Sequence, residues 1–172
     1  MEKIQAHLIG EIISSNSNEA HALYKKSCFG EPKKDKINYT LSEAIFLVEK
    51  GKMEVTSKNK KIPKKELLKK LQKIDKKIQV KYPVYENLRE RGYIVKTALK
   101  FGADFRVYDK GKRPGKVHAK WIVFCEHESK TQKWNEFSAK NRVAHSTKKK
   151  LLLAIVDEEE DISYYEVGWI RP

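Results

Sequence analysis

The pattern of this chain changes near Tyr82 and Pro83, and no other feature constrains the fold as strongly. Before this point, lysine-rich segments carry apolar residues at intervals of three and four, which is typical of amphipathic helices. After it, short apolar segments alternate with polar residues, which is typical of strands. The sequence therefore predicts an α+β protein in two parts. These are a small mixed α/β domain over residues 1–82 and a β-sheet domain with flanking helices over residues 83–172.

Helices dominate the expected N-terminal part. A capping box begins at Thr40, and the helix that it starts is expected to end at Gly51. Pro63 suits the first position of another helix, whose apolar face is expected to run to Ile78. Pro83 is expected to break that run. The lysines on the opposite face of this helix are interpreted as a solvated surface.

Strands and one further helix complete the expected elements. In the N-terminal part, His7–Ile13 is expected to form one strand, Gly30–Lys36 a charged loop and Met53–Thr56 a second strand. In the C-terminal part, the expected strands are Tyr93–Lys96, Asp104–Tyr108, Trp121–Cys125, Leu151–Val156 and Ile162–Ile170, with helices over Val84–Arg91 and Trp134–Val143.

The charge of the chain indicates the kind of partner that it binds. Its 172 residues carry a formal net charge of +14, from 37 Lys and Arg against 23 Asp and Glu. Such an excess favours a polyanionic partner, and nucleic acid is the commonest one. A lysine-rich surface that only keeps the protein soluble is the alternative.

Several simple features bear on the compartment. The sequence has no run of about 18 apolar residues, so no membrane span is expected. Its first residues lack the basic-then-apolar layout of a signal peptide. In a chain without an export signal, Cys28 and Cys125 are expected to be free, buried thiols. Together these features predict a cytoplasmic protein.

Three residue types in the basic C-terminal half suggest a chemistry. Tyr108 and His118 flank the basic segment Asp109–Val117, and Lys149 lies at the start of an apolar run. A tyrosine that activates a 2′-hydroxyl, a histidine that protonates the leaving oxygen and a lysine that neutralises the phosphorane suffice to cleave RNA without a metal. Taken singly, each residue is better explained as a structural or solvated side chain. The hypothesis depends on whether the three meet in space.

Three other sites compete with this hypothesis. Asp109 together with Glu128 and Lys130 superficially matches the acid-plus-Glu-x-Lys layout of metal-dependent nucleases. A zinc site would need Cys125, His127, His118 and His145, but no Cys-x-x-Cys spacing supports it. The acidic run Asp157–Asp161 is interpreted as a hairpin turn or a contact for a basic partner surface, with a cation site as the alternative.

Several blocks of the C-terminal half, taken in order, resemble the archaeal tRNA-splicing endonuclease family. The blocks are Leu88–Lys96, Gly102–Tyr108, His118, Arg142–Ser146, Lys149–Asp157 and Tyr165. The resemblance is dense from about Tyr82 to the C-terminus and weaker over Thr40–Val55. It goes well beyond a single short motif.

The resemblance implies catalytic roles for Tyr108, His118 and Lys149. The family block His-Ser-Val-Arg-Lys-Lys reads His145-Ser146-Thr147-Lys148-Lys149-Lys150 here. Lys148 therefore stands in place of the family arginine, which keeps the positive charge but not the planar guanidinium group. The register of this block favours Lys149 over its two neighbours.

The resemblance also implies residues that bind substrate. The family arginine that grips a bulged RNA base by stacking falls on Arg142. A second stacking residue falls near Tyr164, where an aromatic ring would stand in for a guanidinium. In the basic loop, Lys116 is expected to face the phosphate backbone. No metal site and no cofactor are implied.

The activity implied by the resemblance is excision of introns from precursor tRNA. The family cuts at a bulge–helix–bulge, and the products would carry 2′,3′-cyclic phosphate and 5′-hydroxyl ends.

A chain of this size with a complete triad suggests a homotetramer, with a heterotetramer as the alternative. In that assembly the run Asp157–Asp161 docks on a neighbouring subunit and the tail Tyr164–Pro172 pairs with a sheet edge. The competing function is that of a non-catalytic RNA-binding subunit. The loop Glu31–Lys36 is interpreted either as an insertion that broadens substrate specificity or as a solvated turn.

Overall fold

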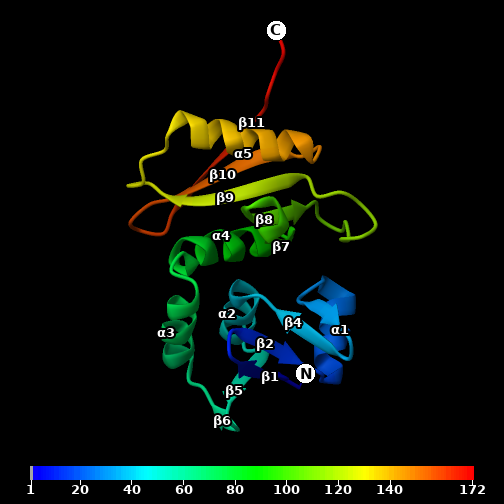
Figure 1. The fold of residues 1–172 in the computed structure, drawn as a ribbon. Helices are drawn as coiled ribbons and strands as arrows, with labels where there is room; N and C mark the ends of the chain where they lie inside the picture. Colours follow the sequence, from blue (N-terminus) through cyan, green and yellow to red (C-terminus); the bar gives the residue numbers. More distant parts are fainter. Residues whose placement is uncertain (1) are drawn as a thin grey trace. The chain divides into compact units, whose positions relative to one another are not determined.

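The computed structural model describes residues 2–172 and divides into two compact units (Figure 1). The first unit ends at Tyr82 and the second begins at Pro83. Each unit contains its own β-sheet and helices, which confirms the α+β class. Among the described residues, no helix combines the length and the apolar character that a membrane crossing requires.

The N-terminal unit is built on a mixed sheet with the strand order β3-β4-β2-β1-β5-β6 among the described residues. The central pair β1 and β5 is parallel, and the remaining pairs are antiparallel. The strands are β1 (Ile4–Ile9), β2 (Ile12–Ser15), β3 (Glu31–Lys33), β4 (Lys36–Tyr39), β5 (Met53–Ser57) and β6 (Lys60–Lys61). The helices are α1 (Asn18–Ser27), α2 (Leu41–Glu49) and α3 (Lys64–Ile74).

Two expectations for the strands of this unit were wrong. The segment expected to be one strand, His7–Ile13, folds back on itself at Gly10, whose φ of 61° is accessible to glycine at little cost. The expected charged loop Gly30–Lys36 instead forms the hairpin of β3 and β4, with Lys33 opposite Lys36. In the second case, backbone pairing with β2 outweighs the polar composition of the segment.

The capping box of α2 is confirmed. The backbone N–H of Glu43 donates to Thr40 Oγ1 at 3.3 Å, and the backbone N–H of Thr40 donates to Glu43 Oε2 at 3.0 Å. The other carboxylate oxygen of Glu43 accepts from the backbone N–H of Gly30 at 2.9 Å. Glu43 is buried, so this single side chain satisfies three donors inside the unit.

The helix expected to run to Ile78 ends earlier. Helix α3 stops at Ile74, and Asp75 has extended backbone angles. The Asp75 carboxylate accepts from the backbone N–H of Lys77 at 2.9 Å, which starts the next helix, α4 (Ile78–Glu90). Pro83 lies inside α4 and does not break it, so the expected break is wrong, although a proline removes one backbone donor from the helix.

The C-terminal unit has a sheet with the strand order β11-β10-β9-β8-β7 among the described residues. The strands β9 and β10 are parallel, and the other pairs are antiparallel. The strands are β7 (Ile94–Ala98), β8 (Ala103–Tyr108), β9 (Trp121–His127), β10 (Lys150–Val156) and β11 (Ile162–Val167), with the short 3₁₀ helix η1 (Leu99–Phe101) between β7 and β8. Helix α5 (Trp134–Ser146) lies along one face of this sheet (Figure 1).

The core beneath α5 holds the helix against the sheet. Ala144 of α5 packs with Ile122 and Phe124 of β9 and with Leu151 of β10. Helix α5 ends at Ser146, three residues later than expected, and Lys148 then adopts a left-handed φ of 55°. The chain therefore reverses between α5 and β10 within a few residues. Cys28 and Cys125 are both buried and form no disulfide bond, which confirms the prediction for the two thiols.

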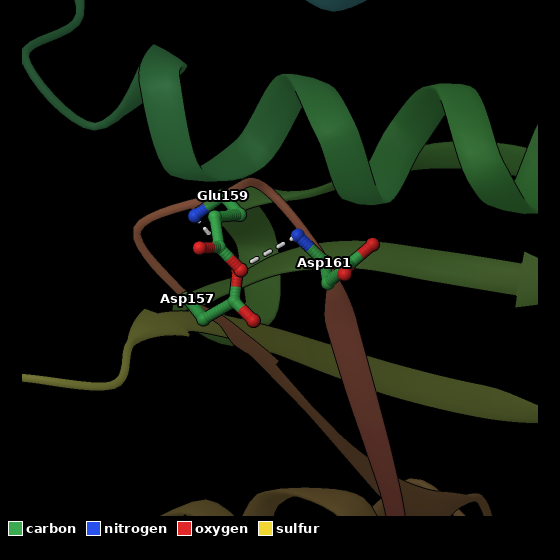
Figure 2. Close-up of side chains that lie close together, drawn as sticks. All are labelled: Asp157, Glu159 and Asp161. Atoms are coloured by element: carbon green, nitrogen blue, oxygen red, sulfur yellow. Dashed lines mark hydrogen bonds between the residues drawn. The ribbon is translucent and has the colours of Figure 1, made fainter.

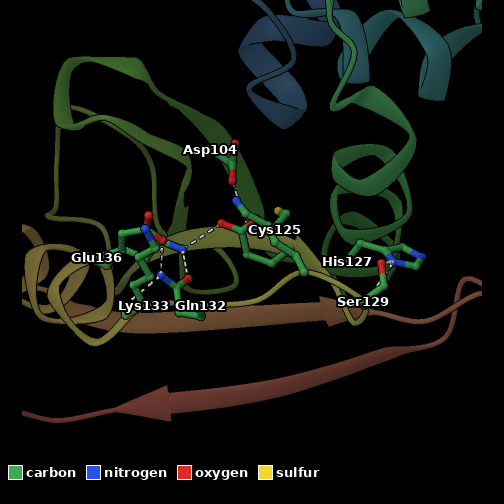
Figure 3. Close-up of polar contacts among 10 residues, drawn as sticks. Asp104, Cys125, His127, Ser129, Gln132, Lys133 and Glu136 are labelled. Atoms are coloured by element: carbon green, nitrogen blue, oxygen red, sulfur yellow. Dashed lines mark hydrogen bonds and ion pairs between the residues drawn. The ribbon is translucent and has the colours of Figure 1, made fainter.

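An ionic network anchors α5 and the preceding loop to β9. The buried carboxylate of Glu126 binds the ammonium groups of Lys130 at 2.8 Å and of Lys140 at 2.7 Å. Lys140 also donates to Gln132 at 2.6 Å, and Gln132 donates to Glu136 at 2.8 Å. Figure 3 shows the Gln132 and Glu136 contacts of this network beside β9.

Candidate active site

A cavity of about 360 Å³ in the C-terminal unit brings together Tyr108, His118 and Lys149. It lies where β8 ends, between the loop that follows β8 and the segment that joins α5 to β10. The residues that line it are Phe101, Arg106, Tyr108, Gly115, Lys116, Val117, His118, Ala119 and Lys149. The three candidate catalytic side chains therefore share one site.

Tyr108 is positioned by the sheet. It is the last residue of β8, pairs with Ile94 of β7 and is buried, with 4% of its surface exposed. Because side chains two residues apart in a strand point to the same face, Tyr108 and Arg106 both face this cavity. A buried ring at a strand end gives the hydroxyl a fixed position.

His118 is positioned by the loop between β8 and β9. The loop is folded by backbone bonds from Lys112 N–H to the Asp109 carbonyl at 3.0 Å and from Val117 N–H to the Arg113 carbonyl at 3.3 Å. Gly115 has a φ of 86°, a conformation that favours glycine. These turns present the exposed His118 side chain on the cavity wall.

Lys149 is positioned by the end of α5. Its backbone N–H donates to the Ala144 carbonyl at 2.9 Å, and its ammonium donates to the Thr147 carbonyl at 2.7 Å. The ammonium also lies 5.5 Å from the centroid of the Phe101 ring. The side chain is half-buried, in contrast to the exposed lysines on either side.

The neighbours of Lys149 do not enter the cavity. Lys148 is exposed, and the ammonium of Lys150 binds Glu166 at 2.5 Å on β11. Strand alternation does not separate the three lysines, because only Lys150 belongs to β10. The left-handed turn at Lys148 separates them instead.

The electrostatics of the cavity favour a bound anion. Arg106, Lys116, His118 and Lys149 line it, and none of its described lining residues is acidic. Burial lowers the pKa of Lys149, and the positive charge of Arg106 lowers it further. An anion between the two side chains would relieve this repulsion. A phosphate group meets that requirement.

The residues expected to bind substrate are placed differently from one another. Lys116 lines the cavity, as noted above. Arg142 is exposed on the last turns of α5 and is not among the lining residues. Tyr164 pairs with Ala154 on the sheet face opposite to the core beneath α5, and its hydroxyl donates to Asn87 of α4 at 3.1 Å. The structure therefore does not bring Tyr164 to the cavity.

Two residues of the cavity were not identified from the sequence. Arg106 could have been found from the strand period, since it lies two residues before Tyr108. Phe101 ends η1, and no sequence signal indicated that its ring would meet Lys149. Outside the cavity, the ring of His145 meets that of Trp169 at 4.4 Å, in the edge-to-face arrangement typical of aromatic pairs.

The competing nuclease site is not assembled. Asp109 lies 3.6 Å from Lys120, next to the first residue of β9, whereas Glu128 follows the last residue of that strand. The seven residues of β9 separate these positions by about 20 Å. Lys130, the third member of the pattern, is bound to Glu126.

The competing metal sites are not supported either. Within residues 2–172, the only group of at least three potential ligands close enough to share an ion is Asp157, Glu159 and Asp161. Figure 2 shows that Asp157 Oδ1 instead accepts the backbone N–H groups of Glu159 at 2.9 Å and Asp161 at 2.8 Å. These bonds are those of a tight turn between β10 and β11. The residues of the alternative zinc site, Cys125, His127, His118 and His145, do not form a group close enough to share an ion.

Comparisons with known proteins agree with the resemblance. The sequence model of the tRNA intron endonuclease catalytic C-terminal domain matches residues 78–164, and that of the tRNA intron endonuclease N-terminal domain matches residues 4–68. A tRNA-splicing endonuclease from Methanothermobacter thermautotrophicus is 39% identical over 171 residues, which cover 99% of each chain. One from Pyrococcus horikoshii is 40% identical over 98% of this chain and 97% of its own.

A third relative is similar over a smaller part of the chain. The tRNA-splicing endonuclease of Nanoarchaeum equitans is 47% identical over 77% of this chain and 88% of its own. The two domain matches cover the fold in order, and the full-length relatives extend over nearly every residue. The chain therefore belongs to the tRNA intron endonuclease family.

Proposed function

We propose that this protein is a metal-independent endoribonuclease that excises introns from precursor tRNA by cutting at bulge–helix–bulge junctions. The observation that carries the proposal is the cavity in which Tyr108, His118 and Lys149 meet. The cavity supplies a proton acceptor or relay, a proton donor and cations for a phosphate. The expected products are a 2′,3′-cyclic phosphate and a 5′-hydroxyl end.

The first step is attack by the 2′-hydroxyl on the adjacent phosphorus. Tyr108 accepts, relays or orients the proton of this hydroxyl. A free phenol has a pKa of about 10 and is a poor base at neutral pH, so relaying or orienting the proton is the alternative to accepting it. The bond from phosphorus to the 5′-oxygen then breaks, and His118 donates a proton to that oxygen.

The cations of the cavity would stabilise the negative charge that develops on the phosphate during the reaction. As the attacking oxygen bonds to phosphorus, negative charge grows on the non-bridging oxygens. The ammonium of Lys149 is held by the Thr147 carbonyl and so is oriented before the reaction begins. A preorganised cation in a partly enclosed site stabilises this charge more than a solvated one does.

Substrate recognition would rest on shape and on charge. Bulged bases are already unstacked, so splaying them onto a flat side chain costs little. Arg142 is exposed and therefore accessible for this stacking role. Lys116 lies on the cavity wall, where it would hold a phosphate beside the cut. Tyr164 is the proposed second stacking residue, which would use its ring, while its hydroxyl is bound to Asn87 outside the cavity.

Two cuts separated by a helix require more than one active site, so we propose that the chain works as a homotetramer. The edge strand β11 and the tail after it expose Tyr165, Trp169 and Ile170, which a partner chain would cover. A heterotetramer is the alternative. Sedimentation of the protein expressed alone tests this assembly: a stable monomer or dimer contradicts it.

Cleavage of a bulge–helix–bulge RNA in excess EDTA tests the chemistry. The variants are Tyr108→Phe, His118→Ala and Lys149→Ala, with Lys148→Ala as a matched control that removes an adjacent exposed lysine. Loss of the proton donor or of the cation is expected to slow cleavage by roughly 10²–10⁴-fold. Lys148→Ala is expected to cut at close to the wild-type rate.

The outcomes separate the alternatives. Wild-type cutting that disappears in EDTA would favour a metal-dependent reaction. Full cutting by all three cavity variants would exclude the proposed triad. Absence of cutting by the wild type, alone and with any partner chain, would favour the non-catalytic RNA-binding subunit. The chemical ends of the products, read by their reactivity to phosphatase and kinase, test the cyclic phosphate.

A further inference from the structure

The positive charge of the N-terminal unit is concentrated in one segment. Residues 1–57 contain eight lysines and eight acidic residues, so they are neutral overall. The next segment, residues 58–81, contains eleven lysines and two acidic residues, a net charge of +9 out of +14 for the chain. Most of this segment is α3 and the turns on either side of it. The candidate cavity lies in the other compact unit.

Helix α3 divides into a buried face and a charged face. Leu67 and Leu71 are buried, with exposed fractions of 1% and 0%. Lys65, Lys69 and Lys73 are exposed and lie on the opposite side of the helix, four residues apart. At 1.5 Å of rise per residue, their positions are spaced by about 6 Å along the helix axis. We call these three residues the α3 lysine row.

The α3 lysine row differs from the other lysines around it. Within residues 2–172, none of its members has an ion pair or hydrogen bond to its ammonium. By contrast, Lys64 binds Glu49 at 2.8 Å and Lys70 binds Glu66 at 3.0 Å. The fold therefore uses some lysines of α3 internally and leaves this row available to a partner.

The row is also unfavourable for the isolated helix. Like charges four residues apart on a helix repel, and the row contains two such pairs. Glutamine has a helix propensity similar to that of lysine, so a neutral polar residue would serve the helix equally well. Neither packing nor helix formation therefore accounts for the charge. A polyanion that binds along the helix would account for it.

We propose that the α3 lysine row is a second RNA-binding surface, which binds phosphates of the precursor tRNA other than those at the reacting junction. This inference rests on the proposed function, because it takes the same RNA as the partner. Phosphate contacts of this kind are independent of sequence and add affinity that weakens with salt. They would position the body of the substrate and leave the chemistry to the cavity.

The composition of the surface argues against other occupants. Protein interfaces are depleted in lysine and enriched in exposed aromatic residues at their centres. None of the large exposed apolar residues in the described part of the chain belongs to residues 58–81. A helix that lies on a membrane needs a free apolar face, whereas Leu67 and Leu71 are already buried. A second copy of the chain offers complementary charge in the run Asp157–Asp161, and sedimentation in the test below addresses this alternative.

A comparison of two charge-matched variants tests the proposal. The first is Lys65→Gln with Lys69→Gln and Lys73→Gln. The control is Lys61→Gln with Lys64→Gln and Lys70→Gln, which removes the same charge from lysines bound to Glu54, Glu49 and Glu66. Binding to full-length precursor tRNA and to a short RNA that contains only the bulge–helix–bulge is measured from 50 to 200 mM salt, and assembly is followed by sedimentation.

The expected result is specific to the full-length RNA. Loss of three phosphate contacts reduces the slope of log affinity against log salt by about 2 to 3. Over this fourfold salt range, wild-type affinity would fall roughly 16- to 64-fold more than that of the row variant. The control variant and the short RNA are expected to show changes in slope below about 1. Arginine at the three positions is expected to keep the wild-type slope.

Contrary results distinguish this inference from the proposed function. If the wild type binds and cuts the RNA but the row variant has an unchanged slope, the second surface is excluded and the proposed function stands. If the row variant loses the wild-type assembly, the row binds a neighbouring subunit and not RNA. If the wild type neither binds nor cuts the RNA, the proposed function itself fails.

Discussion

The ionic network of Glu126 allows a quantitative prediction about stability. Glu126 binds two lysines at almost the same distance, 2.8 Å for Lys130 and 2.7 Å for Lys140. The two lysines differ in exposure: the side chain of Lys130 is 53% exposed and that of Lys140 is 13% exposed. Burial, and not distance, should therefore decide how much each pair contributes to the free energy of unfolding.

The expected magnitudes follow from that difference. Lys130→Met removes an exposed partner and is expected to lower the free energy of unfolding by about 0–1 kcal/mol. Glu126→Gln removes the carboxylate charge and leaves the ammonium of Lys140, beside the Phe124 ring, with neutral acceptors alone, and it is expected to cost about 3–5 kcal/mol. Lys140→Met is expected to fall between the two, because Lys130 still neutralises the carboxylate.

Urea unfolding followed by tryptophan fluorescence measures these values. All three tryptophans, Trp121, Trp134 and Trp169, lie in the C-terminal unit, so the signal reports the unit that contains the network. Equal losses for Lys130→Met and Glu126→Gln would refute the argument from burial. A negligible loss for Glu126→Gln would show that Gln132 and the ring suffice for Lys140.

Further predictions concern pH, the opposite sheet face and the capping box. The pKa of Lys149 is lowered, so its ammonium loses its proton at a lower pH than an ordinary lysine does, and the cleavage rate should decline from that pH upwards. Arg106→Met removes a repelling charge and raises the pKa of Lys149. A pH–rate profile of this variant should therefore show the decline at higher pH. Tyr164→Phe loses the bond to Asn87 and should lower the free energy of unfolding by about 1 kcal/mol in urea titration, with unchanged cleavage. Glu43→Ala deprives several donors of their acceptor and should lower the melting temperature of the N-terminal unit in calorimetry.

Local patterns in the sequence predicted those parts of the fold that local interactions decide. The capping box at Thr40 was correct because its two hydrogen bonds join residues three apart. The apolar run Leu151–Val156 was correct because only a central strand buries such a run. The split of the long helix at Asp75 was missed, because a side-chain bond to the backbone of Lys77 competes there with a continuous apolar period.

Tertiary pairing decided the parts that the sequence could not predict. The charged segment Glu31–Lys36 became a hairpin because β4 adds to the edge of β2, a contact with residues far away in the sequence. Phe101 was missed in the candidate site, since its proximity to Lys149 depends on where the turn after α5 places that lysine. Tyr164 was assigned to substrate by resemblance, and only the register of β10 and β11 shows that it faces α4.

The two basic regions of the chain should act on different steps of the reaction. The cations of the cavity are few, partly enclosed and close enough for Arg106 to lower the pKa of Lys149, so they can stabilise charge that develops in the transition state. The α3 lysine row is exposed and without partners, so it can bind only charge that the RNA already carries. An interaction of equal strength in the ground and transition states changes binding and not the rate of the bound complex. Lys149→Ala should therefore lower kcat, whereas the row variant should weaken binding of full-length RNA and leave kcat unchanged.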